Sequence, residues 1–292
     1  MQQNDNQLID KRQARLAFER AANSYDQAAV LQREVADRML ERLDYIKPIP
    51  DRLLDLGCGT GYTLSPLARR YPGCEIIALD VSTNMLVAAR QKPSIWQRLR
   101  GRFRYLSGDA EQLPLADASV DMIFSSLAIQ WCVDLDKAFA EMRRILKPDG
   151  LLMFTTFGPA TLHELRDCFE QVDDYSHTNR FIDMHDIGDA LLRNGFGDPV
   201  MDMEMLTVTY EDVFSIMRDL KQIGAHNVTQ GRGRGLMGRR RMQAVADAYE
   251  QYRIEQRLPV SYEVLYGHAW AMEKDGTACA TPAEVPVNFM GR

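Results

Sequence analysis

Residues 53–61 read Leu-Leu-Asp-Leu-Gly-Cys-Gly-Thr-Gly, and this stretch constrains the fold more than any other part of the chain. Leu53, Leu54 and Leu56 predict a short buried strand, and the three glycines at alternate positions allow a tight turn beneath a bound ligand. A helix is expected to follow over residues 62–70. A strand, a glycine-rich turn and a helix together are typical of a nucleotide-binding site.

The spacing of Gly57, Gly59 and Gly61 distinguishes between classes of nucleotide. Dinucleotide-binding folds need glycine at the first, third and sixth positions, and the sixth position counted from Gly57 is Tyr62. A nicotinamide-dependent oxidoreductase is therefore disfavoured. Asp55 adds negative charge beside the turn, which suits a ligand carrying a positive group better than a pyrophosphate, which prefers bare amides.

Strands and helices are predicted to alternate along the first half of the chain. Apolar runs indicate strands over residues 75–79, 103–106, 120–124 and 151–157, with helices over 82–91 and 136–146. Two more helices, 161–172 and 183–194, precede the last two strands at 201–210 and 262–270. This pattern predicts an α/β fold with a doubly wound, seven-stranded, mainly parallel sheet.

Acidic residues follow two of these strands. Asp80 ends the strand over residues 75–79, and Asp109 comes shortly after the strand over 103–106. Open α/β sheets bind their ligands at the carboxyl ends of the strands, so Asp55, Asp80 and Asp109 are expected to meet at one edge. For Asp109 the alternative is that the carboxylate only caps a helix.

The predicted elements divide the chain into five segments. Residues 1–47 form an N-terminal helical lid, interrupted near Asn23 and Ser24, and residues 48–210 form the core of the sheet. Residues 211–261 form an inserted helical cap with helices over 211–223 and 239–257, residues 262–272 the last core strand, and residues 273–292 a flexible tail.

Composition excludes several classes of protein. The 292 residues are 46% hydrophobic with a net charge of -6, which argues against a general nucleic-acid binder. The five cysteines form no Cys-x-x-Cys pair, and no apolar stretch is long enough to span a bilayer, so we expect a soluble cytoplasmic protein without a membrane partner. The five histidines are scattered, and we find no metal-ligand cluster or Ser/His/Asp constellation.

The sequence Asp-x-Gly-x-Gly-x-Gly at residues 55–61 resembles motif I of the class I S-adenosylmethionine-dependent methyltransferases. The resemblance implies S-adenosyl-L-methionine as cofactor, S-adenosyl-L-homocysteine as product, and no metal. It also implies that Asp80 accepts hydrogen bonds from the ribose hydroxyls and that Asp109 meets the adenine amino group. The expected cofactor-binding residues are Asp55, Gly57, Cys58, Gly59, Gly61, Asp80, Val81, Met85, Asp109, Ala110 and Leu127.

Other stretches over residues 11–270 resemble one family within that class, the malonyl-acyl carrier protein O-methyltransferases of biotin synthesis. They read Phe-Glu-Arg-Ala-Ala-Asn-Ser-Tyr-Asp at 18–26, Ser-Leu-Ala-Ile-Gln-Trp at 126–131, Phe-Thr-Thr-Phe-Gly-Pro at 154–159, Leu-Lys-Gln-Ile-Gly-Ala at 220–225, Arg-Gly-Leu-Met-Gly at 234–238 and Tyr-Glu-Val-Leu-Tyr-Gly-His-Ala-Trp at 262–270. Such an enzyme transfers the methyl group to the free carboxylate of malonyl-acyl carrier protein. Malonyl-coenzyme A remains open as a second acceptor.

This reaction needs no general base, because a malonyl carboxylate with a pKa of about 4 is ionised at neutral pH. Catalysis is then expected to consist of orienting the reactants with water excluded. Candidates for holding the carboxylate are Tyr25, Gln130, Trp131 and His163, each a polar or aromatic group expected near the mouth of the site. The alternatives are that Tyr25 and Trp131 only pack in the core and that His163 lies on a helix surface.

Arginines in the predicted cap suggest a surface for the acidic carrier protein. They are Arg232, Arg234, Arg239, Arg240 and Arg241, and the alternative is a solvated basic helix end. Two other functions stay open at this point. One is a methyltransferase that acts on another carboxylate or a quinone-like molecule, and the other is a catalytically silent cofactor-binding or scaffold protein.

Overall fold

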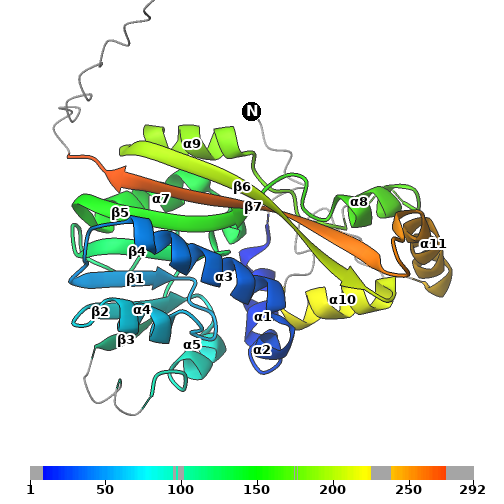
Figure 1. The fold of residues 1–292 in the computed structure, drawn as a ribbon, viewed down its shortest axis with the longest axis horizontal. Helices are drawn as coiled ribbons and strands as arrows, with labels where there is room; N and C mark the ends of the chain where they lie inside the picture. Colours follow the sequence, from blue (N-terminus) through cyan, green and yellow to red (C-terminus); the bar gives the residue numbers. More distant parts are fainter. Residues whose placement is uncertain are drawn as a thin grey trace, which may run out of the picture.

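The structure is a computed structural model that describes residues 9–94, 97, 102–173, 175, 177–224 and 238–273. Its centre is one seven-stranded sheet with the order β3-β2-β1-β4-β5-β7-β6 (Figure 1). The strands are β1 (Arg52–Leu56), β2 (Glu75–Asp80), β3 (Phe103–Ser107), β4 (Val120–Ser126), β5 (Leu146–Phe157), β6 (Phe196–Tyr210) and β7 (Leu258–Ala271). The first five are parallel, and β7 pairs antiparallel with both β5 and β6. The predicted fold class is confirmed.

Helices cover both faces of the sheet. They are α4 (Leu64–Arg70), α5 (Thr83–Ala89), α7 (Leu135–Ile145), α8 (His163–Glu170) and α9 (Met184–Arg193), with a 3-10 turn, η3 (Ile129–Trp131), after β4. Alternate strand residues point to opposite faces, so Leu53 packs in the cluster that contains α4, whereas Leu54 packs in the cluster that contains α7 and α9. Central parallel strands covered on both faces explain the continuous apolar runs of the sequence.

Local capping explains where two of these helices begin. The Ser82 side chain accepts a hydrogen bond from the amide of Met85, and the Asp134 side chain accepts one from the amide of Lys137. Each satisfies an amide that the first turn leaves without a partner. The N-cap residue Ser82 starts α5 two residues after Asp80, so the end of β2 and the start of α5 lie at the same edge of the sheet.

Three helices precede the sheet, namely α1 (Lys11–Ala21), α2 (Tyr25–Ala28) and α3 (Val30–Arg42), followed by a 3-10 turn, η2 (Leu43–Tyr45). The predicted break near Asn23 and Ser24 separates α1 from α2. A second break at Ala29, whose backbone is not helical, was not predicted. We call α1 and α2 the lid, because they cross the edge of the sheet where β1 and β2 end (Figure 1).

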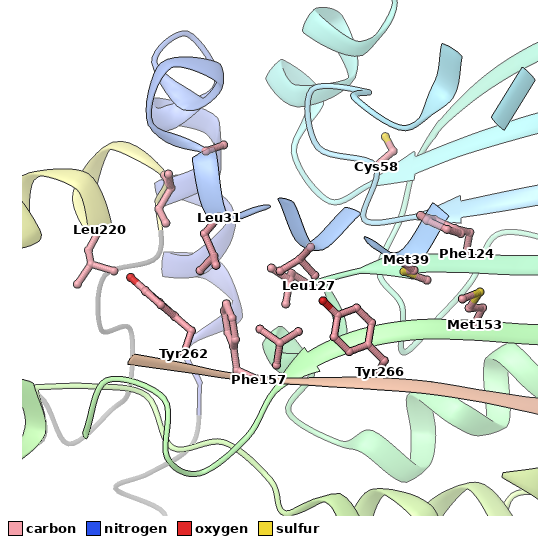
Figure 2. Close-up of a cluster of buried hydrophobic side chains, with 14 of the residues drawn as sticks. Leu31, Met39, Cys58, Phe124, Leu127, Met153, Phe157, Leu220, Tyr262 and Tyr266 are labelled. Atoms are coloured by element: carbon pink, nitrogen blue, oxygen red, sulfur yellow. The ribbon is translucent and has the colours of Figure 1, made fainter. Parts of the chain in front are cut away.

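Helices α10 (Val213–Gln222) and α11 (Arg239–Tyr249) and a 3-10 turn, η4 (Glu250–Tyr252), lie between β6 and β7 in the chain. We call α10 and α11 the cap. The end of α10 touches the lid, because the Ser24 hydroxyl donates to the carbonyl of Gln222 over 3.3 Å (Figure 1). Figure 2 shows Leu31 of α3, Leu220 of α10 and Tyr262 of β7 in one apolar cluster. Tyr25 and Ala28 of α2 also pack against this cluster, so the lid, the cap and the sheet share a core.

Several boundaries differ from the predicted ones. The helix after the glycine turn begins at Leu64 rather than at 62, because residues 57–63 complete the turn first. β6 begins at Phe196 and β7 at Leu258, four or five residues earlier than the sequence patterns suggested. The two strands pair along nearly their whole length. Phe196 and Leu258 are buried, but Pro199 and Pro259 interrupt the apolar pattern at these ends and hide the start of each strand.

Candidate active site

The glycine turn after β1 is built around backbone contacts with β2. The amides of Gly57 and Cys58 both donate to the carbonyl of Leu79, at 2.8 and 3.0 Å, and the amide of Gly59 donates to Asp80 Oδ2 at 2.9 Å. Gly57 has a positive φ, and a Cβ there would lie 2.3 Å from the Cβ of Ala128. Gly57 is thus needed for packing. A Cβ at Gly59 would meet nothing within 4 Å, so this glycine leaves space for a ligand.

Asp80 is held rigidly at the end of β2. Its Oδ2 accepts from the Gly59 amide and its Oδ1 accepts from the amide of Ser82 at 2.8 Å. Burial raises the pKa of Asp80 to about 6, and these amides oppose the shift. A carboxylate has about four lone-pair positions, so roughly two remain for hydroxyl donors of a ligand.

Asp55 lies deeper than Asp80, with 2% of its surface exposed. Its Oδ2 accepts a hydrogen bond from the hydroxyl of Thr63. Burial raises the pKa of Asp55 to about 7, and repulsion from Asp80 contributes to that shift. Two buried acids so close to one turn favour a ligand that brings positive charge.

A pocket of about 910 Å³, counted with the space open to solvent, lies between the glycine turn, the ends of β2, β3 and β4, and the lid. It brings together most of the expected cofactor-binding residues with two of the expected substrate residues. They are Gly57, Gly59, Asp80, Val81, Met85, Asp109, Ala110 and Leu127, together with Tyr25 and Trp131.

A second hollow of about 480 Å³ continues from this pocket on the far side of the glycine turn. It is lined by Asp55, Cys58 and Thr63 and shares Tyr25 and Gly59 with the first pocket. The Cys58 thiol is buried, and burial raises its pKa well above the ordinary value, so it is not a nucleophile at neutral pH.

The sequence reasoning missed one wall of the pocket, which comes from α1. Lys11, Ala14, Arg15 and Phe18 line it, and the Phe18 ring meets Trp131 edge to face with centroids 5.1 Å apart. Their spacing of three and four residues is the signal that could have identified this face of α1.

The lid is joined to the pocket walls by polar contacts. The Glu19 carboxylate accepts from the amides of Thr83 and Asn84 at the start of α5, at 2.9 and 3.0 Å. Asp26 accepts from the hydroxyl of Thr60 at 2.6 Å and pairs with Lys92. α1 and α2 thus lie closed over the glycine turn.

Some of the expected residues do not line either hollow. Gln130 donates from Nε2 to the carbonyl of Leu127 at 2.8 Å and so braces the turn after β4. His163 sits at the start of α8, with Nδ1 3.1 Å from the carbonyl of Ala160 and its ring against Tyr252. Gly61 has no space for a Cβ, which would lie 2.8 Å from the Leu64 side chain and 2.9 Å from the backbone of Ala89, so its role is packing.

The expected partner surface is only partly described. Arg239, Arg240 and Arg241 form the exposed first turn of α11, whereas Arg232 and Arg234 lie outside the described residues. Arg241 Nη1 lies 3.8 Å from Asp173, which also pairs with His177 at 2.6 Å. This contact joins α11 to the segment after α8.

The donor set of the pocket fits a nucleoside with a cationic substituent. Asp80 offers acceptors for hydroxyls, Gly59 leaves the space that a side chain would fill, and apolar Val81 and Met85 can flank a base. Within the described residues, no group of three or more His, Cys, Asp or Glu side chains could hold a metal ion. None of the helices within those same residues has the length and apolarity to cross a bilayer.

The fold and this pocket define the class of the protein as the S-adenosylmethionine-dependent methyltransferases with a class I fold. A family described as "Methyltransferase domain" matches residues 54–154, which include the glycine turn and β4. The YcgJ protein of Bacillus subtilis has a similar fold, with a TM-score of 0.55 and 18% identity over 81% of this chain and 99% of that one. Phosphoethanolamine N-methyltransferase 2 of Haemonchus contortus, solved with S-adenosylmethionine, gives a TM-score of 0.53 and 18% identity over 87% of this chain and 57% of that one.

A closer relative is the malonyl-[acyl-carrier protein] O-methyltransferase of Nitrosospira multiformis. It is 56% identical over 279 residues, which cover 91% of each chain. This chain therefore belongs to the malonyl-[acyl-carrier protein] O-methyltransferase family.

Proposed function

We propose that this enzyme transfers a methyl group from S-adenosylmethionine to the free carboxylate of malonyl-acyl carrier protein. The products are S-adenosylhomocysteine and the methyl ester that enters the pimeloyl branch of biotin synthesis. The observation that carries the proposal is the 56% identity over 91% of both chains with a relative named for this activity. Four of the cysteines, Cys58, Cys74, Cys132 and Cys168, are free thiols, which supports a cytoplasmic location.

S-adenosylmethionine supplies a methyl group on a positively charged sulfonium. Asp80 is proposed to accept from the ribose hydroxyls with the lone pairs that the two backbone amides leave free. Asp109 is proposed to accept from the adenine amino group, and Asp55 to face the ammonium group from the second hollow. No metal takes part in this scheme.

The acceptor needs no base, because its carboxylate is ionised at neutral pH. The chain's task is to hold that carboxylate without protonating it. Burial and the charges of Asp80 and Asp26 raise the pKa of Tyr25, so its hydroxyl stays a neutral hydrogen-bond donor. We assign Tyr25 and Trp131 to the acceptor, because both line the pocket, whereas Gln130 and His163 do not.

Exclusion of water favours this reaction, because the carboxylate and the sulfonium both lose their charge as the ester forms. Water stabilises the charged reactants more than it stabilises the transition state, in which the charges are partly neutralised, so an apolar wall lowers the barrier relative to water. Phe18, Leu127 and Ile129 supply such a wall beside Trp131. The lid therefore contributes to the chemistry by closing the pocket.

The first turn of α11 supports docking of an acidic carrier protein. Its N-cap is Gly238, which offers no side-chain acceptor, and the turn contains no acidic residue. Arg239, Arg240 and Arg241 thus add to the positive end of the helix dipole, where cations are unfavourable by themselves. Such a concentration of positive charge is favourable when an anionic surface binds to it.

The test is to incubate the purified protein with S-adenosylmethionine and malonyl-acyl carrier protein and to measure the intact mass of the carrier. A gain of one methylene on the malonyl form, with none on the acetyl form, which lacks the free carboxylate, is the expected result. Methylation of malonyl-coenzyme A in parallel reports whether the carrier is required. A carrier mass that does not change, while another carboxylate or a quinone-like compound is methylated, would contradict the proposed substrate.

A further inference from the structure

The first residue of the lid, Lys11, occupies a place that the proposed mechanism does not use. Its Nζ lies 2.7 Å from Asp109 Oδ2 and 2.7 Å from Glu111 Oε1, and its side chain lines the pocket. Asp109 is the carboxylate that the proposed function assigns to the adenine amino group. A residue of the lid thus holds a residue of the nucleoside site directly.

The contact fixes the carboxylate of Asp109 in one orientation. Lys11 binds Oδ2, while Oδ1 accepts from the backbone amide of Glu111 at 3.0 Å. One lone pair on each oxygen remains free. Without Lys11 the side chain of Asp109, which is 42% exposed, would keep only the hydrogen bond from the Glu111 amide among the described residues and could rotate away from the base.

Glu111 extends the connection to the substrate side of the pocket. It is 7% exposed and its Oε1 also accepts from the amides of Val133 and Asp134, at 2.6 and 3.2 Å. These amides follow the turn that carries Trp131. Lys11 therefore joins the lid, the adenine end and the segment after β4 at one point. Burial lowers the pKa of Lys11, but hydrogen bonds to both acids outweigh it and raise the pKa, so the ammonium stays charged.

We propose that Lys11 is the positioning residue that orients Asp109 for the adenine amino group and fastens α1 over the nucleoside. The inference rests on the proposed function, because it uses the cofactor position assigned there. The inference adds that the contact of Lys11 with Asp109 couples closure of the lid to binding of the adenine. Lys11 touches no reacting atom, so its effect is on nucleoside affinity rather than on methyl transfer.

The experiment measures dissociation constants by calorimetry for two ligands, S-adenosylhomocysteine and 5′-methylthioadenosine, which lacks the amino-acid end. Lys11→Met is expected to weaken both ligands by the same factor, on the order of tenfold, as for the loss of one charge-assisted contact. Lys11→Arg should restore most of the affinity. Asp55→Asn should weaken S-adenosylhomocysteine alone, because Asp55 faces the end that the shorter ligand lacks.

The matched control is Lys147→Met, which removes a lysine that pairs with Asp121 at 2.6 Å away from the pocket. This variant should bind both ligands as the wild type does. Unchanged affinity in Lys11→Met, or a loss confined to S-adenosylhomocysteine, would overturn the role of Lys11. Wild-type protein that binds neither ligand would overturn the proposed function and this inference together, whereas normal wild-type binding with an unaffected Lys11→Met variant would overturn only the inference.

Discussion

The buried carboxylate of Asp55 should make the ligand-free enzyme less stable as the pH rises. Its pKa is about 7 in the folded chain, against an ordinary value of 3.8. The folded chain therefore holds the proton more tightly than the unfolded chain. The stability that this proton contributes is complete below pH 3.8 and is lost as the pH rises to about 7.

The magnitude follows from the size of the shift. Each pKa unit corresponds to about 1.4 kcal/mol, so ionisation of Asp55 costs roughly 4 kcal/mol at pH 8 and roughly 1.5 kcal/mol at pH 5. Asp55→Asn removes the charge and keeps an oxygen that can accept from Thr63. Burying the amide costs the same at both pH values. The free energy of unfolding of Asp55→Asn minus that of the wild type should therefore be about 3 kcal/mol more positive at pH 8 than at pH 5.

Urea denaturation of both proteins at the two pH values, followed by tryptophan fluorescence, measures this difference directly. The same variant should bind S-adenosylmethionine roughly tenfold more weakly at pH 8, because the ligand's positive charge loses its buried counterpart. A difference between variant and wild type that is equal at pH 5 and pH 8 would refute the reasoning. It would mean that Asp55 pays no penalty for its charge in the folded chain.

Three further predictions concern the pocket and its surroundings. Gly59→Ala should raise the dissociation constant for S-adenosylmethionine at least tenfold, at a stability cost of about 1 kcal/mol for the left-handed backbone. Gly57→Ala should fold poorly, because its Cβ would lie 2.3 Å from the Cβ of Ala128. Equal losses of thermal stability in the two variants would contradict this distinction. Tyr25→Phe should lower turnover tenfold or more without changing calorimetric cofactor binding, as expected for a lost donor, while His163→Ala should keep normal turnover; full activity in Tyr25→Phe would remove it from the site. Reversing Arg239, Arg240 and Arg241 to Glu should raise the KM for malonyl-carrier protein but not for a small malonyl thioester, and reversal of Arg69, Lys137 and Arg193 on other helices is the control of equal charge. Equal effects on the two substrates would count against docking at α11.

The sheet could be predicted because its signals are local. Most of the strands contain a short apolar run, the acids at the strand ends follow within a few residues, and the glycine spacing needs only seven residues. The predicted starts of β6 and β7 were wrong because Pro199 and Pro259, which disfavour a strand, lie inside the β6–β7 ladder, so the apolar pattern is broken near Phe196 and Leu258. The break at Ala29 also has no signal in residue type, because alanine favours a helix.

The pocket residues that follow one strand could be predicted for the same reason, and so could a lid over residues 1–47, but the contacts between the lid and the pocket could not. Asp80, Val81 and Met85 lie within six residues of one another, whereas Lys11 meets Asp109 across 98 positions of sequence. Periodicity shows that α1 has an apolar face but not what the face covers. His163 was expected near the mouth of the site, but it does not line the pocket, because α8 places its ring against Tyr252.

Because the proposed acceptor is already ionised, a catalytic base cannot contribute to substrate specificity in this site. A reaction that needs a base requires a histidine or carboxylate aimed at the acceptor. The acids that line this pocket, Asp80 and Asp109, are proposed to bind the nucleoside, and the residue proposed to contact the acceptor, Tyr25, is a neutral phenol. The substrate must then be selected by segments that reach the pocket from elsewhere. The lid supplies Phe18 against Trp131, and the cap touches the lid where a Cβ on Gly224 would meet the Phe18 ring at 3.1 Å. The lid and the end of α10 thus form one connected layer over the pocket, and motif I is not part of that layer. Motif I alone therefore indicates the cofactor but not the acceptor.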